Sequence, residues 1–344
     1  MFQPQYTISH TTLEYISNIS KKLAELNLLT IPQELLRHIR KQCRLALTHF
    51  STEIEGNKLS QEEVIEVIEH HKTFGLKRDE LEVRNYFTLL EKLPIYCKKY
   101  TGKLSKELIL LFHSQCMKDI VEDDFLHTYR TTQNAIYDAQ TSKLVYLPPE
   151  AKDVMQLMED LCEWINTSDI NPFILSSIFH NQSVTIHPFI DGNGRVARII
   201  SLYILYSRGY NLCNIIPIDR YYATDRARYY LMLQLNYSHN YYFGRNNTNF
   251  TPWIEYYLEG IYETLAATLN QVETCTIENI LFNNRQDKTI QLLRKKKFIT
   301  ASEYAKMFFI STRMATRDLC QLVQWKKVVV IGKGRATKYI LLLK

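Results

Sequence analysis

The chain has 344 residues, of which 46% are hydrophobic and 23% charged, a balance typical of a globular protein with a large core in two or three units. The N-terminus has no basic region followed by an apolar stretch, and no apolar run reaches the roughly 18–20 residues of a membrane span, so we expect neither a secretory signal nor a membrane anchor. The seven cysteines are scattered and form no Cys-x-x-Cys pair, which argues against a disulfide framework or a structural zinc site and predicts a cytoplasmic protein.

The charge is unevenly distributed along the chain. The whole chain carries 42 Lys and Arg against 36 Asp and Glu, a net charge of +6. Residues 285–344 hold 15 basic and 3 acidic residues, so their net charge is +12 and that of residues 1–284 is −6. The two parts should therefore prefer different partners.

The first 284 residues are expected to be mainly helical. Apolar residues recur at helical spacing in segments that are bounded by proline, glycine or polar clusters. The predicted helices cover residues 31–47, 147–165, 171–186, 195–210 and 226–242.

A glycine follows the first of these helices, in the sequence Ser51-Thr-Glu-Ile-Glu55-Gly56-Asn57. Taken by itself, this segment is a helix end, because glycine readily takes the left-handed conformation that stops a helix. That interpretation requires no function for Glu55.

Residues 129–150 break the helical pattern. Thr, Tyr, Val and Ile stand at near-alternate positions on either side of a polar turn from Asp138 to Ser142. The alternation indicates a β-hairpin packed against helices, although a plain connection between two helices would also fit.

The segment with the most chemistry is His-Pro-Phe-Ile-Asp-Gly-Asn-Gly-Arg-Val-Ala-Arg, residues 187–198, which lies between two apolar helices. A Gly-x-Gly turn that opens a helix exposes backbone N–H groups to an anion, and the helix dipole adds about half a positive charge there. Arg195 and Arg198 are three residues apart and project on one side of the first helical turn. Two guanidinium groups beside a helix N-terminus suit a polyphosphate.

The same loop supplies a base, a carboxylate and an amide. The amide of Asn193 can donate a hydrogen bond to the anion, and Asp191 can hold Mg²⁺ against phosphate oxygens. A neutral His187 can accept a proton from an incoming hydroxyl. Each of these residues alone is more often structural, but their combination within one short loop predicts a phosphate-transfer site.

Residues 285–344 indicate three short helices followed by a hairpin, an order that resembles a winged helix-turn-helix domain. Thr300 and Ser311 are suitable helix caps, and a Gly-Lys-Gly-Arg turn separates two β-rich runs. The helix at 311–327 would present Arg313 and Arg317 to a nucleic-acid groove, with Arg335 on the wing. A protein-binding or dimerisation module has the same order of elements, and the net charge makes DNA an equally good partner.

Residues 187–198 match every fixed position of the signature of the Fic family, His-x-Phe-x-Asp/Glu-Gly-Asn-Gly-Arg-x-x-Arg, and the resemblance to Fic proteins extends over about residues 30–265. It implies a mainly α fold with a Fic-type helical core and a β-hairpin flap, followed here by the winged helix-turn-helix domain. We accordingly divide the chain into an N-terminal helical region (1–100), a catalytic core (101–265), a linker helix (266–284) and a C-terminal domain (285–344).

The resemblance also implies a reaction, in which AMP is transferred from ATP to a Ser, Thr or Tyr hydroxyl of a target protein, including the chain itself. His187 would deprotonate the hydroxyl, and Asp191 would hold Mg²⁺. The phosphates would be bound in an anion hole formed by Gly192, Asn193 and Gly194 and by a clamp formed by Arg195 and Arg198. Electrostatic positioning by these groups would account for most of the catalysis.

Residues 51–57 resemble the inhibitory motif of Fic proteins, Ser/Thr-x-x-x-Glu-Gly/Asn, through Ser51, Glu55 and Gly56. The resemblance implies that Glu55 pairs with Arg198, with help from Ser51. An arginine engaged in this way cannot bind the γ-phosphate. In some family members the same glutamate helps to remove AMP, so a reverse reaction is also implied.

Two further segments resemble parts of the family's substrate sites. The hairpin at 129–150 occupies the place of the Fic flap, which binds an extended target segment by backbone pairing, and Val145 and Tyr146 would line it. Residues 223–233 loosely resemble the region around the adenine pocket. That resemblance places Tyr229, Tyr230 and Asn236 beside the base.

Two other functions stay open. The loop recognises phosphates and not bases, so transfer of another nucleotide or phosphate-bearing group fits the same residues. Alternatively, the chain is a DNA-binding regulator whose Fic-like core is only a sensor, although the intact His187, Asp191 and both arginines argue against a retired active site. We also expect a homodimer, because many relatives with an N-terminal inhibitory motif self-associate.

Overall fold

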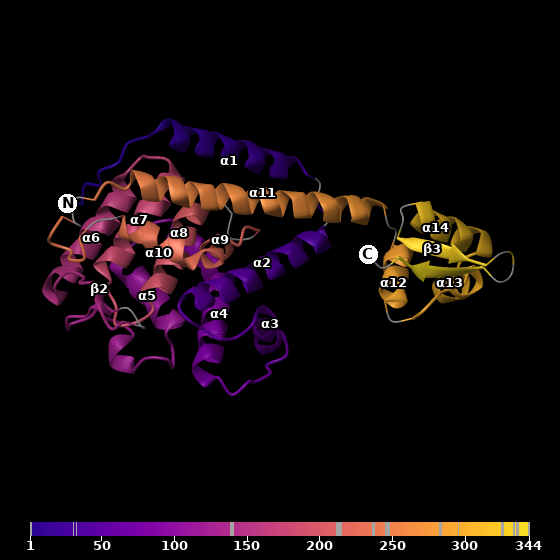
Figure 1. Ribbon diagram of the computed structural model, residues 1–344, viewed down its shortest axis with the longest axis horizontal. Helices are drawn as coiled ribbons and strands as arrows, with labels where there is room; N and C mark the ends of the chain where they lie inside the picture. Colours follow the sequence, from indigo (N-terminus) through magenta and orange to yellow (C-terminus); the bar gives the residue numbers. More distant parts are fainter. Residues whose placement is uncertain are drawn as a thin grey trace. The chain divides into compact units, whose positions relative to one another are not determined.

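The computed structural model describes residues 2–29, 31, 33–137, 141–210, 215–235, 238–244, 248–281, 284–294, 296–324, 327–332, 334 and 337–342. The contacts between residues divide the chain into two units, Met1–Asn270 and Gln271–Lys344 (Figure 1). The boundary falls within one long helix, α11 (Thr251–Leu281).

The first unit is built from helices with one small hairpin. Before the hairpin come α1 (His10–Leu28), α2 (Gln33–Ile54), α3 (Gln61–Glu69), α4 (Lys77–Lys99), α5 (Lys106–Cys116) and the short 3-10 helix η1 (Asp123–Phe125). The hairpin consists of β1 (Ile136–Tyr137) and β2 (Leu144–Tyr146). It is followed by α6 (Ala151–Thr167), α7 (Pro172–Ile186), α8 (Asn193–Ser207), α9 (Asp219–Thr224), α10 (Arg226–Gln234) and the first part of α11.

Helices α7 and α8 form the centre of this unit. α7 starts where the Asn171 side chain caps the backbone N–H of Phe173, with Pro172 in the first turn. Residues on all faces of α7 are buried, which is the pattern of a core helix. Ser176 Oγ of α7 donates to the Ser201 carbonyl of α8 at 2.8 Å. The loop between the two helices is therefore held at both ends by the core.

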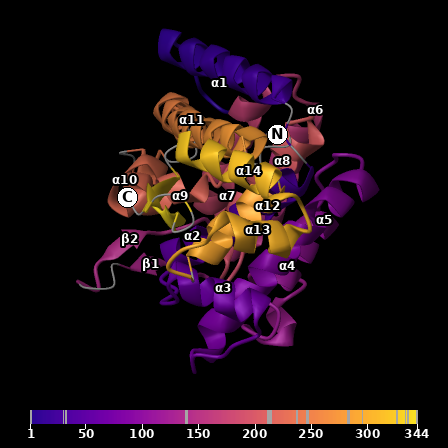
Figure 2. The ribbon, with the colours of Figure 1, turned by 90° about the vertical axis from the view of Figure 1, so that its right-hand side faces the viewer.

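The N-terminal helix α1 packs along the first part of α11, as Figures 1 and 2 show. Ser9 caps α1 by accepting from the backbone N–H of Thr12 and donates to Glu255 Oε1 of α11 at 2.5 Å. About two turns further, the rings of Tyr15 and Tyr262 lie 5.9 Å apart. The N-terminus of the chain is thereby attached to the helical core.

The hairpin predicted at 129–150 is present but short, with Ile136 opposite Tyr146 and Tyr137 opposite Leu144. Part of its predicted turn lies outside the described residues. The mainly α fold with a small β-hairpin is thus confirmed.

The helix predicted at 226–242 is too long. α10 ends at Gln234, where Leu235 takes a left-handed conformation with a φ of 51°. After a short gap in the described residues, the chain instead pairs with the end of the hairpin, since the Leu147 N–H donates to the His239 carbonyl at 2.7 Å and the Tyr241 N–H donates to the Leu147 carbonyl at 3.1 Å. Hydrogen bonds to the end of the hairpin therefore determine the conformation of this segment, although its tyrosines stand at helical spacing.

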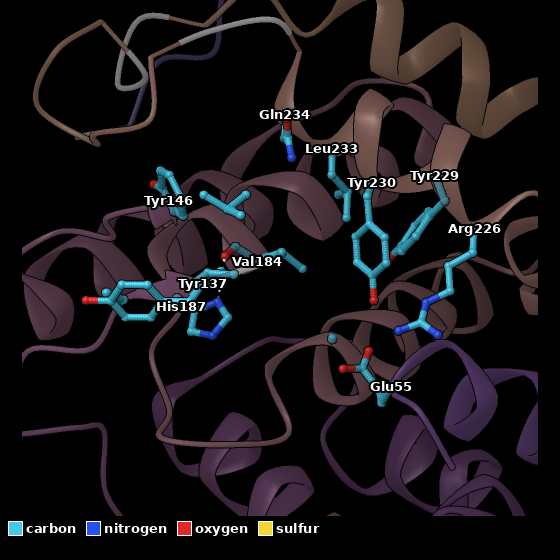
Figure 3. Close-up of a pocket in the computed structure, with 14 residues that line it drawn as sticks. Glu55, Tyr137, Tyr146, Val184, His187, Arg226, Tyr229, Tyr230, Leu233 and Gln234 are labelled. Carbon is cyan, nitrogen blue, oxygen red and sulfur yellow. Dashed lines mark hydrogen bonds between the residues drawn. The ribbon is translucent and has the colours of Figure 1, made fainter. Parts of the chain in front are cut away.

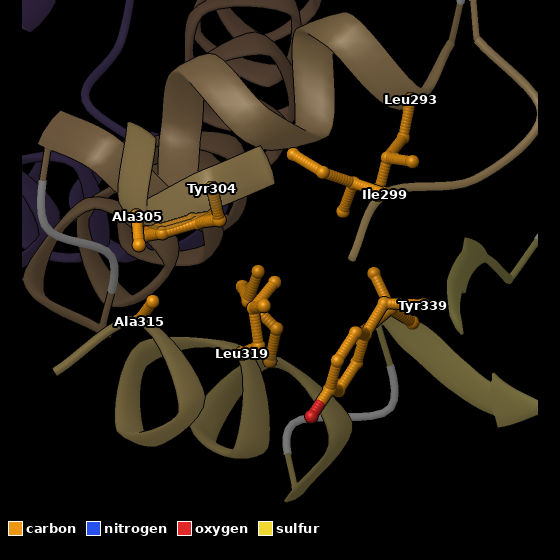
Figure 4. Close-up of a cluster of buried hydrophobic side chains, with 9 residues drawn as sticks. Leu293, Ile299, Tyr304, Ala305, Ala315, Leu319 and Tyr339 are labelled. Carbon is orange, nitrogen blue, oxygen red and sulfur yellow. The ribbon is translucent and has the colours of Figure 1, made fainter. Parts of the chain in front are cut away.

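The second unit contains α12 (Asn284–Leu293), α13 (Ala301–Phe308), α14 (Thr312–Gln324), β3 (Val328–Ile331) and β4 (Lys338–Leu341), besides the end of α11. Its core brings together apolar side chains from all five elements, with Leu319 and Tyr339 among them (Figure 4). Thr300 and Glu303 form a capping box at the start of α13, and the Ser311 hydroxyl accepts from the backbone N–H of Met314 in α14.

Three helices and an antiparallel hairpin therefore follow one another as the sequence predicts. Of the predicted second helix of the pair, 311–327, α14 covers Thr312–Gln324, and residues 325 and 326 lie outside the described residues. The assignment as a winged helix-turn-helix domain and the four domain boundaries stay predictions. Among the described residues, no helix is both long and apolar enough to cross a membrane.

Candidate active site

The segment after α2 reaches the N-terminus of α8. α2 ends at Ile54, and Gly56 has a φ of 97°, so the chain turns immediately after Glu55. Oε1 of Glu55 accepts a hydrogen bond from Arg198 Nη2 at 2.8 Å. A methyl group added at Gly194 would overlap the same oxygen. The Glu55 carboxylate therefore lies against the first turn of α8, where the backbone N–H groups and the helix dipole favour an anion.

Arg198 is enclosed by acceptors. Its Nε donates to Ser51 Oγ at 2.8 Å, and its Nη2 donates to the Ser51 carbonyl at 2.8 Å. Oδ2 of Asp219 lies 3.9 Å from Nε, and both of these charged side chains are 1% exposed. Two carboxylates thus share one buried guanidinium, whose orientation is fixed by Ser51.

Two tyrosines of α10 contact Arg198 and the end of α2. The Tyr229 hydroxyl accepts from Arg198 Nη1 at 3.4 Å and lies 2.9 Å from His180 Nε2. Burial lowers the pKa of His180 well below its usual value, so the neutral ring can accept the Tyr229 proton. Tyr230 donates to the Ile54 carbonyl at 3.0 Å, which attaches α10 to the last turn of α2.

His187 ends α7 in a left-handed conformation, with φ 53° and ψ 58°. Its Nδ1 lies 3.2 Å from the Val184 carbonyl. Because a carbonyl only accepts, Nδ1 carries the proton and Nε2 keeps a lone pair. Burial lowers the pKa of His187 to about 4, so the ring is neutral at pH 7. Arg130 Nε donates to the His187 carbonyl at 2.9 Å and supports this conformation.

The Asn193 side chain requires a correction. Its Nδ2 donates to the Phe189 carbonyl and its Oδ1 accepts from the Phe189 N–H, both at 2.8 Å. The amide therefore closes the loop on its own backbone instead of pointing at an incoming anion. Gly192 is required by geometry, since its φ is 82° and an added Cβ would lie 2.6 Å from Met117 Sδ.

Asp191 is paired with arginines from two helices. Its Oδ1 accepts from Arg195 Nη2 at 3.2 Å, and its Oδ2 accepts from Arg78 Nη2 in a short contact. Glu82 lies between the two arginines, with its Oε1 3.1 Å from Arg195 Nη1 and 3.3 Å from Arg78 Nε. α4 thus contributes two charged residues to the loop that carries the signature.

A cleft of about 840 Å³ opens beside these groups, a size that suits a small-molecule ligand. Figure 3 shows Glu55, Arg226 and Tyr230 on one side of it and His187 and Tyr137 on the other. Of the residues predicted for the site, the cleft is lined by Glu55, Val145, Tyr146, His187, Gly194, Tyr229 and Tyr230. Asn236 lies outside the described residues.

Known proteins resemble the part of the chain that carries this site. Residues 103–205, which include α7, the loop and most of α8, match the Fic/DOC family. This part of the chain is similar to the Fic/DOC family. Curated relatives include protein adenylyltransferase fic-1 of Caenorhabditis elegans, which is 28% identical over 208 residues, 58% of this chain and 38% of that protein. Protein adenylyltransferase Fic of Drosophila willistoni is 25% identical over 235 residues, which cover 64% of this chain and 42% of that protein. The chain thus matches less than half the length of these relatives.

Solved structures share the fold. A Fic family protein from Desulfovibrio desulfuricans G20 aligns over 100% of this chain and 99% of its own, with a TM-score of 0.74 and 23% identity. A Fic-1 structure from C. elegans aligns over 76% of this chain and 73% of its own, with a TM-score of 0.62 and 22% identity. At these identities the likeness shows the fold alone.

Within the part that matches the Fic/DOC family, the hairpin is fixed next to His187. The Tyr146 hydroxyl donates to the Thr185 carbonyl near the end of α7 at 2.9 Å, and His239 Nδ1 lies 2.7 Å from the Val145 carbonyl. Tyr137 on the other strand is 61% exposed. The hairpin therefore combines an anchored strand with a strand that faces outward.

Several residues of this candidate site were not predicted from the sequence. Arg78, Glu82 and Arg130 stand far from the signature, and no local spacing marks them. His113 donates to the Asp191 carbonyl at 3.1 Å and stacks on Phe189 with ring centroids 3.8 Å apart. Its position directly after the apolar run 108–112 is the signal that could have marked it.

Proposed function

We propose that the protein is an autoinhibited adenylyltransferase that moves AMP from ATP to a Ser, Thr or Tyr hydroxyl of a protein. The observation that carries the proposal is the cleft itself. A neutral His187 with a free Nε2 lines the same cleft as Gly194, at the helix N-terminus where a carboxylate already lies. A base and an anion site in one cleft are what phosphoryl-type transfer requires. The curated relatives bear the name protein adenylyltransferase, which supports the choice of AMP.

The reaction balances with the groups present. The target oxygen forms a bond to the α-phosphorus of ATP, and its proton passes to Nε2 of His187. The bond between the α-phosphorus and the oxygen that bridges to the β-phosphate breaks, so pyrophosphate leaves. Gly192, Gly194, Arg195 and Arg198 would bind phosphate oxygens, and the exposed edge of the flap would pair with the target segment.

The carboxylate of Asp191 fits a divalent cation. It already binds positive charge, because the guanidinium groups of Arg78 and Arg195 are both paired with it. Asp191 would hold Mg²⁺, whose chemistry is to neutralise charge on the phosphates.

The position of Glu55 supports the proposed autoinhibition. Its carboxylate occupies Arg198 and overlaps the space above Gly194, so it uses both groups that a phosphate would need. A negatively charged phosphate would also be repelled by it. ATP would therefore bind with its phosphates poorly placed until Glu55 moves away.

The test is an assay with α-labelled ATP and Mg²⁺ on three variants. We expect Glu55→Gly to raise AMP transfer at least about tenfold, and His187→Ala in that background to abolish it. Glu53→Gly is the matched control, because it adds glycine to the same helical turn while the exposed Glu53 side chain contacts only His49 among the described residues. Equal transfer by Glu55→Gly and Glu53→Gly would overturn the autoinhibition.

The same variants test which nucleotide is used and whether the reaction also runs in reverse. In the Glu55→Gly background, labelled ATP should outcompete GTP, CTP and UTP; a preference for another base would replace AMP by that nucleotide. Because Glu55 lines the cleft with His187, we also propose that the unchanged protein slowly removes AMP. AMP release from a modified target that persists in Glu55→Gly would exclude a role for Glu55 in it.

A second proposed function concerns DNA and the second unit. On α14, Arg313 and Arg317 are exposed, whereas the acidic Asp318 is buried and accepts from Arg285 and Tyr304. A helix with a basic exposed face can bind phosphates of a nucleic acid. Arg335, predicted for the wing, lies outside the described residues.

Binding to a labelled DNA duplex at two salt concentrations tests this function. We expect Arg313→Glu with Arg317→Glu to weaken binding more than ten-fold (about 1.4 kcal/mol) and to reduce its salt dependence. Lys288→Glu with Lys306→Glu, which makes the same charge change on α12 and α13, is the control. Equal losses in both double variants would indicate unspecific attraction, and no loss in either would leave protein binding as the role of this unit.

A further inference from the structure

Arg78, in the first turn of α4, contacts the Asp191 carboxylate. Both oxygens of the Asp191 carboxylate are engaged: Oδ1 accepts from the Gly192 N–H and from Arg195, and Oδ2 accepts from Arg78. Arg195 is 2% exposed in its side chain and belongs to the same helical turn as the loop. Arg78 is different, because it comes from another helix and its side chain is 59% exposed.

A guanidinium and a divalent cation compete for the same lone pairs. A cation at Asp191 would have to approach the carboxylate from its open side, where Arg78 now lies, and the two positive charges would repel each other at that distance. Arg78 can leave at little cost, since among the described residues its other side-chain contact is an ion pair with Glu82 within its own helix. Glu82 would still hold Arg195 after Arg78 had moved.

The start of α4 is also bonded to the inhibitory segment. The Asn57 amide donates to Glu82 Oε2 and to the Asp79 carbonyl, both at 3.0 Å. The Lys58 N–H donates to Asp79 Oδ2 at 2.9 Å. A continuous set of polar contacts therefore runs from the residues after Glu55, through α4, to Asp191.

We propose that Arg78 is a second inhibitory contact, which occupies Asp191 in place of the divalent cation and must swing away before the cation binds. The inhibitory segment then acts on two parts of the site: Glu55 occupies Arg198, and Arg78, positioned by the neighbouring Glu82, occupies Asp191. The inference rests on the proposed function in one respect, the assignment of the cation to Asp191. It adds a residue and an order of events, with release of Arg78 preceding cation binding.

The experiment measures Mn²⁺ binding by electron paramagnetic resonance, in the full chain saturated with α,β-methylene-ATP, which cannot transfer AMP. We expect Arg78→Ala and Arg78→Gln to tighten Mn²⁺ binding by about tenfold relative to the unchanged chain. Arg84→Ala is the matched control on the same helix. Arg84 is paired with His71 and the Lys72 carbonyl rather than with the loop, and its loss should leave the affinity unchanged. Thermal unfolding of each variant verifies that it is folded.

Three results would overturn the inference. Unchanged or weaker Mn²⁺ binding in both Arg78 variants would show that Arg78 does not compete. An equal gain in Arg84→Ala would show a general effect of positive charge. An affinity in Arg78→Ala that is the same with and without Asp191→Ala would show that the cation lies elsewhere. None of these results depends on AMP transfer, so the proposed activity can stand or fall separately in the assay with labelled ATP.

Discussion

At Arg198, two carboxylates compete for one buried guanidinium, and they differ in what they can do. Glu55 is attached to a helix end and is partly exposed, so it can leave. Asp219 is 1% exposed at the start of α9 and stays. Burial raises the pKa of Asp219 to about 6, and the nearby Arg198, Ser51 and Tyr86 oppose the rise only in part. The permanent partner of Arg198 is therefore a carboxyl that titrates near neutral pH.

The raised pKa of Asp219 predicts a change of stability with pH. The folded chain binds this proton up to about pH 6, whereas the unfolded chain releases it near pH 4. The stabilising effect of the proton is present below pH 4 and is lost as the pH rises to 6, with a total of roughly 3 kcal/mol. Asp219→Asn removes this dependence, so its Tm relative to the unchanged chain should increase between pH 5 and 7.5. A difference in Tm that does not vary with pH would contradict the assignment.

The lowered pKa of His187 predicts how the rate of AMP transfer changes at acid pH. Burial favours the neutral ring, which loses its base function only when the pH falls towards 4. We expect the rate of AMP transfer by Glu55→Gly to be independent of His187 ionisation from pH 5.5 to 8. The measurement uses the Asp219→Asn background, so that this carboxyl does not contribute. A half-maximal rate near pH 6.5 would show an unperturbed histidine.

The sequence predicted the residues of the signature because their chemistry is concentrated in one loop. The sequence could not predict the roles of Arg78 and Asp219. Each lies at the start of a helix, where arginine and aspartate are common without any function. Their roles arise only when α4 and α9 pack beside α8. For Asn193 the residue was correctly selected but its side chain was given the wrong partner, because a local bond to Phe189 was available.

At the scale of helices and strands, the hydrogen bonds between the end of α2 and the start of α4 are well placed to regulate the position of the inhibitory segment. Asn57 is 9% exposed and bonds to both Asp79 and Glu82. The adjoining helix α3 is independently stabilised by a capping box at Ser60. A change at Asn57 should therefore loosen the inhibitory segment without unfolding its surroundings.

Asn57→Ala tests this view. It removes three hydrogen bonds, two donated by the amide and one accepted from the Leu59 N–H, and leaves their partners unsatisfied, so we expect a loss of about 1–3 kcal/mol in the free energy of unfolding. AMP transfer should rise above that of the unchanged chain but stay below that of Glu55→Gly. Urea unfolding and the assay with labelled ATP provide the two readouts. A loss of stability with no rise in transfer would show that this contact is only structural.

Helical spacing predicted α6, α7 and α8 well, because each is long and tightly bounded. It failed for 226–242, where tyrosines at helical spacing belong partly to a segment that pairs with the flap. Sequence periodicity cannot distinguish these cases, since a tyrosine packs equally well in either conformation.

At the scale of the whole molecule, the two units carry opposite net charges and different proposed tasks. The acidic part, residues 1–284, contains the residues that match the Fic/DOC family, and residues 285–344 carry the net charge of +12. The sequence alone showed this division, because net charge needs no knowledge of packing. What the basic unit binds, whether the chain forms a homodimer and whether it resides in the cytoplasm stay predictions, since these depend on partners that are not encoded in a local pattern.

The central claim is that releasing Arg198 from Glu55 turns this cleft into an AMP-transferring site. Mass spectrometry tests it most directly, after the Glu55→Gly variant has been incubated with ATP, Mg²⁺ and cell lysate, with His187→Ala in the same background as the control. The account predicts an AMP adduct on a Ser, Thr or Tyr side chain of a lysate protein or of the chain itself, absent in the control. A phosphate adduct without the nucleoside, or no adduct at all, would contradict it.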